Sequence, residues 1–512
     1  MNIHSPARLV REALLAAGCA ALAACAIGPA YHPPTAPRLS RYTAVPEAAA
    51  VPAAPAAHGS LAHAQTLERG HTVDSHWWRA FGSPDLDVLV ARALRHNPDI
   101  AAAQATLRQA SEELRAARGL FYPQIALGLG AERTRTSGAA TGGSFGPQLY
   151  NLYTGQVSVG YNPDVFAVNR LVTRGAHAEV DVARSRLDAA RLALSGNVVD
   201  VVLQLAALQD EIAATHSNVD SQQRALRLIQ TQYQLGAVAQ FEVFTQQSLL
   251  ASTQAQLTQL QQARDAALHL LATYLGVYPT SAATLALPKL SRLTLPTDLP
   301  LSLPSALVQA RPDIRAAEAQ LRAANAEVGI AVARMYPSLQ LSASWGAQSN
   351  LTRTFLDPAS RLWDIGAGLA APLFEGGTLR AQKQAAQAAY RAVFANYQST
   401  VLQAFRNVAD VLRALQHDSA FLDAQARALH AAHAALALVR IEYRAGEVDY
   451  LSLLTSETQY QKASIAFVAA EAQRLADTAA LYVALGGGRW NADPMQPAAA
   501  ASARAPAPTE AK

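Results

Sequence analysis

Residues 187–212 read LDAARLALSGNVVDVVLQLAALQDEI, and their apolar residues recur at three- and four-residue spacing. This spacing is typical of an α-helix that buries one stripe of its surface. The surrounding sequence has no proline between Pro163 and Pro279 and is rich in Ala, Leu, Gln, Arg and Glu, which favour helices. The sequence therefore predicts a helix from about 168 to 235, roughly 100 Å long at about 1.5 Å per residue.

The same organisation occurs twice in the chain. A second proline-free stretch lies between Pro372 and Pro494, and three landmarks return in the same order, displaced by 214, 214 and 210 residues. They are Asn97-Pro98-Asp99-Ile100 with Arg311-Pro312-Asp313-Ile314, Tyr122-Pro123 with Tyr336-Pro337, and Tyr233-x-x-Gly236 with Tyr443-x-x-Gly446. A period this long does not suit a solenoid, so the sequence predicts a duplicated unit whose halves pack side by side.

The residues after each Tyr-Pro alternate with period two. Four such segments lie near 124–132, 153–161, 338–346 and 363–370, each apolar on one face and small or polar on the other. This pattern is typical of membrane barrel strands, although a soluble half-buried sheet gives the same alternation. The long predicted helices favour the barrel, because a small sheet could not cover them. We expect Trp345, Trp363 and Ile365 to face lipid and Gly366 to face the opposite side.

Four strands cannot close a barrel, for which roughly eight are needed. Open strand edges in lipid would leave backbone groups unpaired, so other copies must complete the sheet, and three copies would supply twelve strands. The predicted fold class is thus mainly α with a membrane β-barrel. It consists of a duplicated unit of very long antiparallel helices with four strands per chain.

The N-terminus resembles a lipoprotein signal. Arg8 and Arg11 precede the apolar run from Ala13 to Ala24, which is too short to span a membrane and ends in Leu-Ala-Ala-Cys25. We predict a signal peptide over 1–24 and a lipid on Cys25; the alternative is an ordinary cleaved signal with a chance cysteine. Ala26, rather than aspartate, follows the cysteine and favours the outer membrane.

Composition divides the rest of the chain. Every helix pattern between the two copies is interrupted by proline, at Pro288, Pro296, Pro300 and Pro304. The net charge is +4 and the basic residues are scattered, so the sequence does not indicate nucleic-acid binding. The predicted parts are a lipid-anchored, extended N-terminal arm over 25–75, a first repeat over 76–285, a Pro-rich linker over 286–304, a second repeat over 305–490 and a disordered tail over 491–512.

The sequence offers no constellation for catalysis. His58, His63, His71 and His76 lie in an irregular arm without cysteine or helical spacing, so we interpret them as solvated rather than as a metal site. Gly486–Gly488 lacks the context of a phosphate loop and is expected to end a helix. We therefore expect no enzyme activity, no cofactor and no metal.

Several motifs resemble the outer-membrane factor family, specifically its TolC-related, NodT/OprM-like lipoprotein branch. They run from Cys25-Ala-Ile-Gly-Pro through Trp78-x-x-Phe81, both Pro-Asp-Ile motifs and Pro372-Leu-Phe-x-Gly-Gly377 to Ala484-Leu-Gly-Gly-Gly-x-Trp490. The resemblance implies a homotrimer with a twelve-stranded barrel in the cell outer membrane and a helical tunnel extending into the periplasm. It also implies a periplasmic adaptor and an inner-membrane transporter as partners, and passive efflux of drugs or other small toxic compounds.

The resemblance also suggests site residues. Each Tyr-x-x-Gly would close a hairpin at the periplasmic tip, where a nearby acid often rings the aperture; exposed acids on a solvated loop are the alternative. Thr455 stands where the family often has aspartate, and we interpret Glu242 as the corresponding acid after Gly236. Ala167 replaces a usual glycine, which we expect to affect only the strand-to-helix turn. The candidate residues are Tyr233, Gly236, Glu242, Tyr443, Gly446, Glu447 and Asp449 at the tip, and Phe166, Phe374, Gly376 and Gly377 at the barrel-to-helix corners.

Two other classes of protein remain as alternatives, a lipid-anchored periplasmic adaptor and a coiled-coil scaffold. An adaptor has helical hairpins but only one copy of the unit, and a scaffold would not need lipid-facing strands. Ion conductance in planar bilayers separates them from a channel.

Overall fold

The computed structural model describes residues 28–35, 37, 39, 41–45, 49–57, 59–137 and 148–488. The predicted signal peptide, Cys25, His58 and the predicted tail lie outside these residues. The chain divides into two compact units, each built from both halves of the sequence. The first contains Ala105–Arg184 and Ala316–Ser399 with the N-terminal residues up to Pro34, and the second contains Thr35–Gln104, Ser185–Arg315 and the residues from Thr400 onward.

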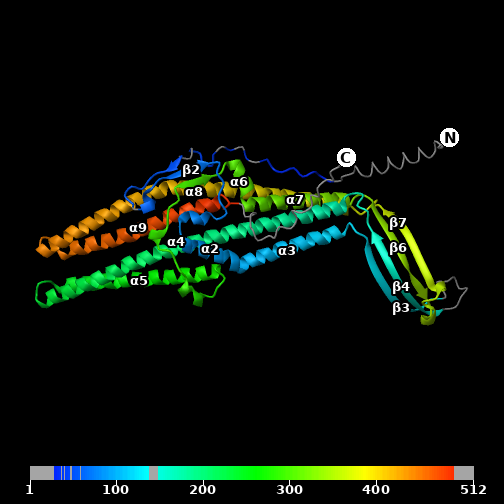
Figure 1. Ribbon diagram of the computed structural model, residues 1–512, viewed down its shortest axis with the longest axis horizontal. Coiled ribbons are helices and arrows are strands. Elements are labelled where there is room, and N and C mark those ends of the chain that lie inside the picture. Colours follow the sequence, from blue (N-terminus) through cyan, green and yellow to red (C-terminus); the bar gives the residue numbers. More distant parts are fainter. Residues whose placement is uncertain are drawn as a thin grey trace, which may run out of the picture. The chain divides into compact units, whose positions relative to one another are not determined.

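The first unit contains an antiparallel sheet of four strands in the order β3-β4-β6-β7 (Figure 1). The strands are β3 (Gln124–Arg135), β4 (Leu149–Tyr161), β6 (Ser338–Ser349) and β7 (Arg361–Ala370). Two short 3₁₀ helices, η6 (Thr352–Thr354) and η7 (Pro358–Ser360), connect β6 to β7. All four predicted strands are therefore confirmed.

The register of this sheet confirms the predicted faces. Leu127 pairs with Val157, Val157 with Trp345, and Trp345 with Trp363, so these side chains share one face. Ile365 lies on this face and is 79% exposed, whereas Gly366 belongs to the opposite, small and polar face. Large apolar side chains exposed over a whole sheet face are suited to contact with lipid.

The helices of the first unit pack through small and apolar residues. They are α3 (Pro98–Gly119), α7 (Pro312–Ala333) and the adjoining parts of α4 (Val168–Gln234) and α8 (Thr378–Ala445). Leu114 of α3 packs on Val180 of α4, and Leu171 of α4 packs on Ile330 of α7. A Cβ on Gly329 of α7 would approach the Leu171 side chain to 2.9 Å, so glycine permits this close packing.

The helix predicted over 168–235 is observed as α4, of 67 residues, and its counterpart α8 has 68. In the second unit these helices lie with α5 (Gln240–Tyr274) and α9 (Tyr450–Ala484), both of 35 residues. By length and hydropathy α4 could cross a membrane, but 67% of its most apolar window is buried within the protein. Its apolar stripe therefore serves a protein core.

A small sheet in the second unit corrects the prediction that the arm is irregular, and its third strand lies in the Pro-rich linker. Strand β2 (Gln65–Arg69) lies between the antiparallel β1 (Ala50–Val51) and the parallel β5 (Asp298–Leu301). Pro300 is compatible with β5 because an edge strand needs no donor on its outer side. The remaining elements are η1 (Gly59–Ala62), η2 (Trp77–Phe81), α2 (Pro84–His96), η4 (Pro279–Thr284), η5 (Leu290–Arg292) and α6 (Pro304–Ala310).

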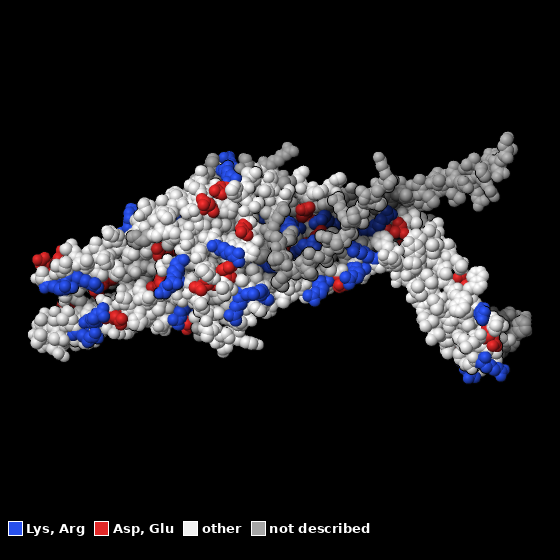
Figure 2. Space-filling model, viewed as in Figure 1, with Lys and Arg blue, Asp and Glu red and all other residues white. Residues whose placement is uncertain are grey.

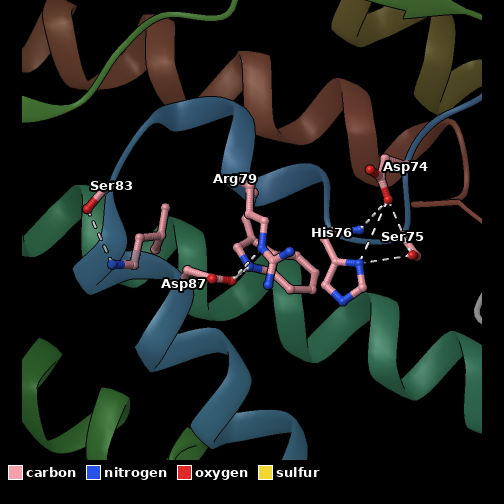
Figure 3. Close-up of polar contacts among 8 residues, drawn as sticks. Asp74, Ser75, His76, Arg79, Ser83 and Asp87 are labelled. Atoms are coloured by element: carbon pink, nitrogen blue, oxygen red, sulfur yellow. Dashed lines mark hydrogen bonds and ion pairs between the residues drawn. The ribbon is translucent and has the colours of Figure 1, made fainter. Parts of the chain in front are cut away.

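The start of α2 is held by side-chain hydrogen bonds (Figure 3). Ser83 accepts from the Leu86 N–H at 3.3 Å, and Asp87 accepts from Trp78 Nε1 at 2.8 Å and Arg79 Nε at 3.0 Å. A hydroxyl at this position satisfies a helix donor that would otherwise have no partner. Trp78 is buried together with Trp77 and Phe81, and these three rings anchor the segment.

The glycine run after α9 fits against this segment. Gly486, Gly487 and Gly488 all have positive φ, and α9 ends at Ala484, as predicted for a helix end. A Cβ on Gly488 would lie 2.5 Å from the Ser75 backbone nitrogen. Glycine is therefore required for backbone approach as well as for its left-handed conformation.

Candidate functional site: two helical hairpins and the barrel corners

The first Tyr-x-x-Gly segment ends α4 and turns the chain into α5. Gly236 has a φ of +79°, its N–H donates to the Tyr233 carbonyl at 2.9 Å, and the Ala237 N–H donates to the Gln232 carbonyl at 2.8 Å. This pair of bonds is the Schellman closure, in which a left-handed glycine satisfies the last helix carbonyls. The chain is then free to begin α5 at Gln240.

The second segment closes in the same way. Gly446 has a φ of +77°, its N–H donates to the Tyr443 carbonyl at 3.1 Å, and the Glu447 N–H donates to the Glu442 carbonyl at 2.9 Å. Helix α9 follows at Tyr450. Both predicted hairpins are therefore present, with equivalent hydrogen bonding in the two halves of the chain.

The acidic residues beside the two turns occupy different positions. Asp449 is the N-cap of α9 and accepts from the Ser452 N–H at 2.9 Å. Hydrogen bonds from the Ser452 side chain and backbone hold the pKa of Asp449 below its usual range. The equivalent N-cap of α5 is Ala239, which has no side-chain bond. Glu242 lies in the first turn of α5, at the position that Ser452 occupies in α9.

This register corrects one interpretation of the sequence. Helices α5 and α9 begin 210 residues apart, so Thr455 corresponds to Thr245 and not to Glu242. Within one chain, Glu242 lies near Tyr443 of the second hairpin and, after burial, contributes to the raised pKa of that tyrosine. Glu447 and Asp449 are exposed beside the second turn.

The two hairpins share an apolar cluster. Its buried members come from α4, α5, α8 and α9 and are Ile229, Val243, Leu436, Tyr450 and Leu453. Tyr443 packs against this cluster, with its ring 6.0 Å from that of Tyr450. Tyr233 is 43% exposed, so the two tyrosines of the repeated motif have different environments.

Polar contacts also join the hairpins, and no local feature of the sequence predicts them. The Tyr450 hydroxyl donates to Gln246 Oε1, and Gln461 Nε2 donates to Gln256 Oε1 at 3.3 Å. Gln246 is fully buried and also donates to the Gln222 carbonyl at 3.0 Å. A polar cavity of about 260 Å³ lies beside these side chains. These contacts connect residues about 200 positions apart, beyond the reach of periodicity or spacing.

The first barrel-to-helix corner is capped by Asp164 and packed by Phe166. Asp164 accepts from the N–H groups of Asn169 and Arg170 at 2.8 and 2.9 Å. The Phe166 ring stacks on Tyr336 with centroids 5.5 Å apart. Ala167 has a φ of +65° immediately before α4, which agrees with a local effect at the turn.

The second barrel-to-helix corner has counterparts of Phe166 and Tyr336, but their rings do not stack within the described chain. Gly376 and Gly377 have φ values of +60° and +88° and lead into α8. Phe374 and Tyr122 are the equivalents of Phe166 and Tyr336, but they belong to opposite edges of the sheet. Phe374 is 89% exposed and Tyr122 is 69% exposed, and no ring contact joins them within the described chain.

The histidines of the arm make isolated contacts. His71 Nδ1 lies 2.8 Å from a Glu68 oxygen, and His76 Nδ1 lies 3.8 Å from an Asp74 oxygen. In the part of the chain that the structure describes, no three His, Cys, Asp or Glu side chains converge as metal ligands.

A sheet with an exposed apolar face that passes directly into helices of 67 and 68 residues is the architecture of an outer-membrane channel. Residues 89–277 and 303–487 match the family model described as outer membrane efflux protein, and the chain belongs to this family. It is 33% identical over 422 residues to the pyoverdine export outer membrane protein OpmQ of Pseudomonas aeruginosa, covering 81% of this chain and 88% of OpmQ.

Solved structures agree with this assignment. The outer-membrane channel OprN has a TM-score of 0.80 at 28% identity and covers 91% of this chain and 99% of its own. VceC of Vibrio cholerae has a TM-score of 0.75 at 28% identity and covers 81% and 99%. The protein is thus a transport protein of the outer membrane, an exit duct for efflux that extends into the periplasm.

Proposed function

We propose that three copies of this chain form a twelve-stranded barrel continued by a helical tunnel, and that the trimer receives small toxic compounds from an inner-membrane transporter through a periplasmic adaptor. Among the described residues, the order β3-β4-β6-β7 leaves one edge of β3 and one edge of β7 without a partner. In lipid, each unpaired backbone group costs several kcal/mol. Pairing β7 of one copy with β3 of the next removes every open edge.

The observation that supports this assembly most directly is the unequal state of the two corners. Phe166 stacks on Tyr336, where β4 of the first half meets β6 of the second half. Phe374 and Tyr122 are the equivalent pair for a junction between β7 and β3, and both are exposed in one chain. A neighbouring copy that reproduces the β4–β6 junction would bring Phe374 onto its Tyr122. The duplicated sequence therefore specifies a contact that only a second copy can complete.

Cysteine cross-linking tests the assembly. With Tyr122→Cys and Phe374→Cys in one chain, a short bismaleimide is expected to give covalent dimers and trimers. Phe166→Cys with Tyr336→Cys is the matched control, and its cross-link should stay within one chain. Covalent oligomers from the control pair alone, or from neither pair, would contradict the proposed junction.

The hairpins are the proposed docking and gating end of the duct. Leu235 and Phe241 beside the first turn are 79% and 75% exposed, which suits burial against an adaptor. Glu242, Glu447 and Asp449 would be repeated around the threefold axis as carboxylate rings. OpmQ is named for pyoverdine export. A passive duct does not select its cargo, and in our proposal the partner transporter does.

Lipidation of Cys25 is supported by the path of the first described residues. Asn325 of α7 donates to the Pro29 carbonyl at 3.1 Å, and a Cβ on Gly28 would lie 3.1 Å from the Gly329 Cα. Gly329 is one turn from the end of α7, close to the start of β6. Cys25 is three residues before Gly28 in the sequence. Cys25→Ser should abolish labelling by radioactive palmitate, and undiminished labelling would exclude this anchor.

A further inference from the structure

A cavity of about 440 Å³ lies in the first unit, where the sheet gives way to helices. Its lining includes Phe121, three residues before β3 begins, and Arg170, the third residue of α4. Its polar lining also includes Arg174 of α4, Arg322 of α7 and Tyr31 of the N-terminal segment, together with Thr173, His177 and Asn325. Figure 2 shows basic side chains over the helices that adjoin the sheet. A site of this size can hold part of a small ligand.

One cationic charge in this cavity is not compensated. Arg170 pairs with Asp164, with Nε 3.0 Å from Oδ2, and Arg322 pairs with Asp181, with Nη1 3.1 Å from Oδ2. Arg174 makes no ion pair and no hydrogen bond within the described chain. An anion entering the cavity would therefore meet the full charge of Arg174, flanked by two further guanidinium groups.

Two buried donors in the same lining lack partners. The Tyr31 hydroxyl and Arg322 Nε are inaccessible to solvent, and neither makes a hydrogen bond with any described residue. Burial and the nearby Glu318 carboxylate raise the pKa of Tyr31, so its hydroxyl keeps the proton and remains a donor. Leaving such groups unpaired is costly. Arg174 is exposed, and a small shift of the other two side chains would let them join it as donors to an anion that has several acceptor oxygens, as a phosphate group has.

The cavity lies at the depth of lipid headgroups. The exposed Tyr122 and Tyr336 immediately precede the membrane strands, where amphipathic aromatic side chains mark the interface. Arg170 and Arg174 lie in the first two turns of α4, about 5–10 Å beyond this boundary. The cavity walls, which include Phe121 and Ala178, are largely apolar and suit the glycerol and first methylene groups of a lipid.

We propose that this cavity binds the phosphate-bearing headgroup of an anionic phospholipid from the periplasmic leaflet of the outer membrane, with Arg174 as its principal ligand. The proposal rests on the location of the protein in the outer membrane, but not on the identity of its cargo or of its partner pump. It would hold the helices beneath the barrel against the leaflet independently of any acyl chain on Cys25.

The binding of dioctanoyl phosphatidylglycerol to the purified full-length protein, measured by calorimetry, tests the proposal. Arg174→Ala should raise the Kd about fivefold, since one arginine near an anionic lipid surface contributes about 1 kcal/mol. Tyr31→Phe keeps the ring, removes the donor and should raise the Kd by a smaller factor. Arg118→Ala is the matched control, because Arg118 is an exposed arginine in the last turn of α3 outside the cavity, and its Kd should be unchanged.

Further measurements distinguish a lipid headgroup from free phosphate as the source of the bound phosphate group. Inorganic phosphate should bind more weakly than the lipid, because it gains nothing from the apolar wall. If the lipid and inorganic phosphate bind with the same affinity, and Arg174→Ala weakens both to the same extent, the lipid proposal would be overturned in favour of a free-phosphate site. Equal weakening by Arg118→Ala would overturn it in favour of general electrostatic attraction. If Arg174→Ala fails to assemble, Tyr31→Phe decides, and an unchanged Kd in that variant would contradict the site.

Discussion

Ala167 carries local strain that its counterpart avoids. Among the described residues it is the one non-glycine with a positive φ, and the equivalent residue before α8 is Gly377. The left-handed region costs an L-residue about 1–2 kcal/mol, partly offset by the greater unfolded-state freedom of glycine. Ala167→Gly should therefore stabilise the protein by about 0.5–1 kcal/mol, measured as a higher thermal unfolding temperature.

The reverse substitution is the control for this prediction. A Cβ on Gly377 would meet no atom within 4 Å, so Gly377→Ala changes backbone strain without a steric clash. It should destabilise the protein by about 1 kcal/mol. A loss of stability in both variants would show that the side chain of Ala167 contributes more by packing than it costs in strain.

Asp418 of α8 should make stability depend on pH. Burial, a hydrogen bond with Asp477 and the charge of Asp477 raise the pKa of Asp418 to about 8, against the opposing effect of Arg474. The folded chain therefore keeps a proton that the unfolded chain releases near pH 4. The free energy of unfolding should fall as pH rises from about 4 to about 8.

Asp418→Asn keeps the shape of the side chain without a titrating proton, so it should flatten this decline and exceed wild type in stability at pH 8. Thermal unfolding at pH 5 and pH 8 measures the effect. Asp410→Asn is the control, because Asp410 lies on the same helix and is 72% exposed. Parallel pH curves for wild type and Asp418→Asn would contradict the assignment.

At the scale of elements, the hairpins can be tested without disturbing their fold. Asp449 caps α9, so Asp449→Asn removes its charge while keeping a good N-cap, whereas alanine would cost about 1 kcal/mol. Together with Glu242→Gln it should weaken the cation preference of the channel, because rings of like charge focus the field in a narrow pore. Reversal potentials under a salt gradient provide the measurement.

Asp265→Asn on α5 is the control for these hairpin variants, since this exposed acid pairs with Arg264 away from the turn. It should leave the selectivity unchanged. A double variant as cation-selective as wild type would mean that Glu242 and Asp449 are surface charges outside the conduction path.

The elements differ in how far the sequence alone could predict them. The proline-free stretch after Pro163 and the period-two segment after Pro123 carry strong local signals. The predicted helix agrees with α4 to within one residue, and the predicted strand begins where β3 begins but ends three residues short of Arg135. The small sheet of β1, β2 and β5 cannot be predicted in this way, because β1 has only two residues and β2 pairs with a strand about 230 positions away. The hydrogen bond between Tyr450 and Gln246 was missed for the same reason, since its partners are 204 positions apart.

For the whole molecule, the assignment of sheet faces predicts opposite effects of two substitutions in β7. Ile365→Arg places a charge among lipid-facing side chains and should cost about 2–4 kcal/mol if it lies near mid-membrane. Gly368 lies on the opposite face, where an added Cβ would meet no atom within 4 Å. Gly368→Ser should therefore reduce the stability of the protein only slightly. The yield of heat-resistant oligomer measures both, and equal loss would mean that the faces are assigned wrongly.

The connection between β4 and β6 has a consequence for the timing of biogenesis. About 180 residues separate the end of β4 from the start of β6. At a synthesis rate of about 5–20 residues per second, the β3–β4 hairpin waits on the order of 10–35 s for its partner. Throughout this interval its apolar face and free edge can pair with another nascent chain. The amount of finished channel in a cell should therefore depend on how well unpaired hairpins are kept apart until β6 arrives.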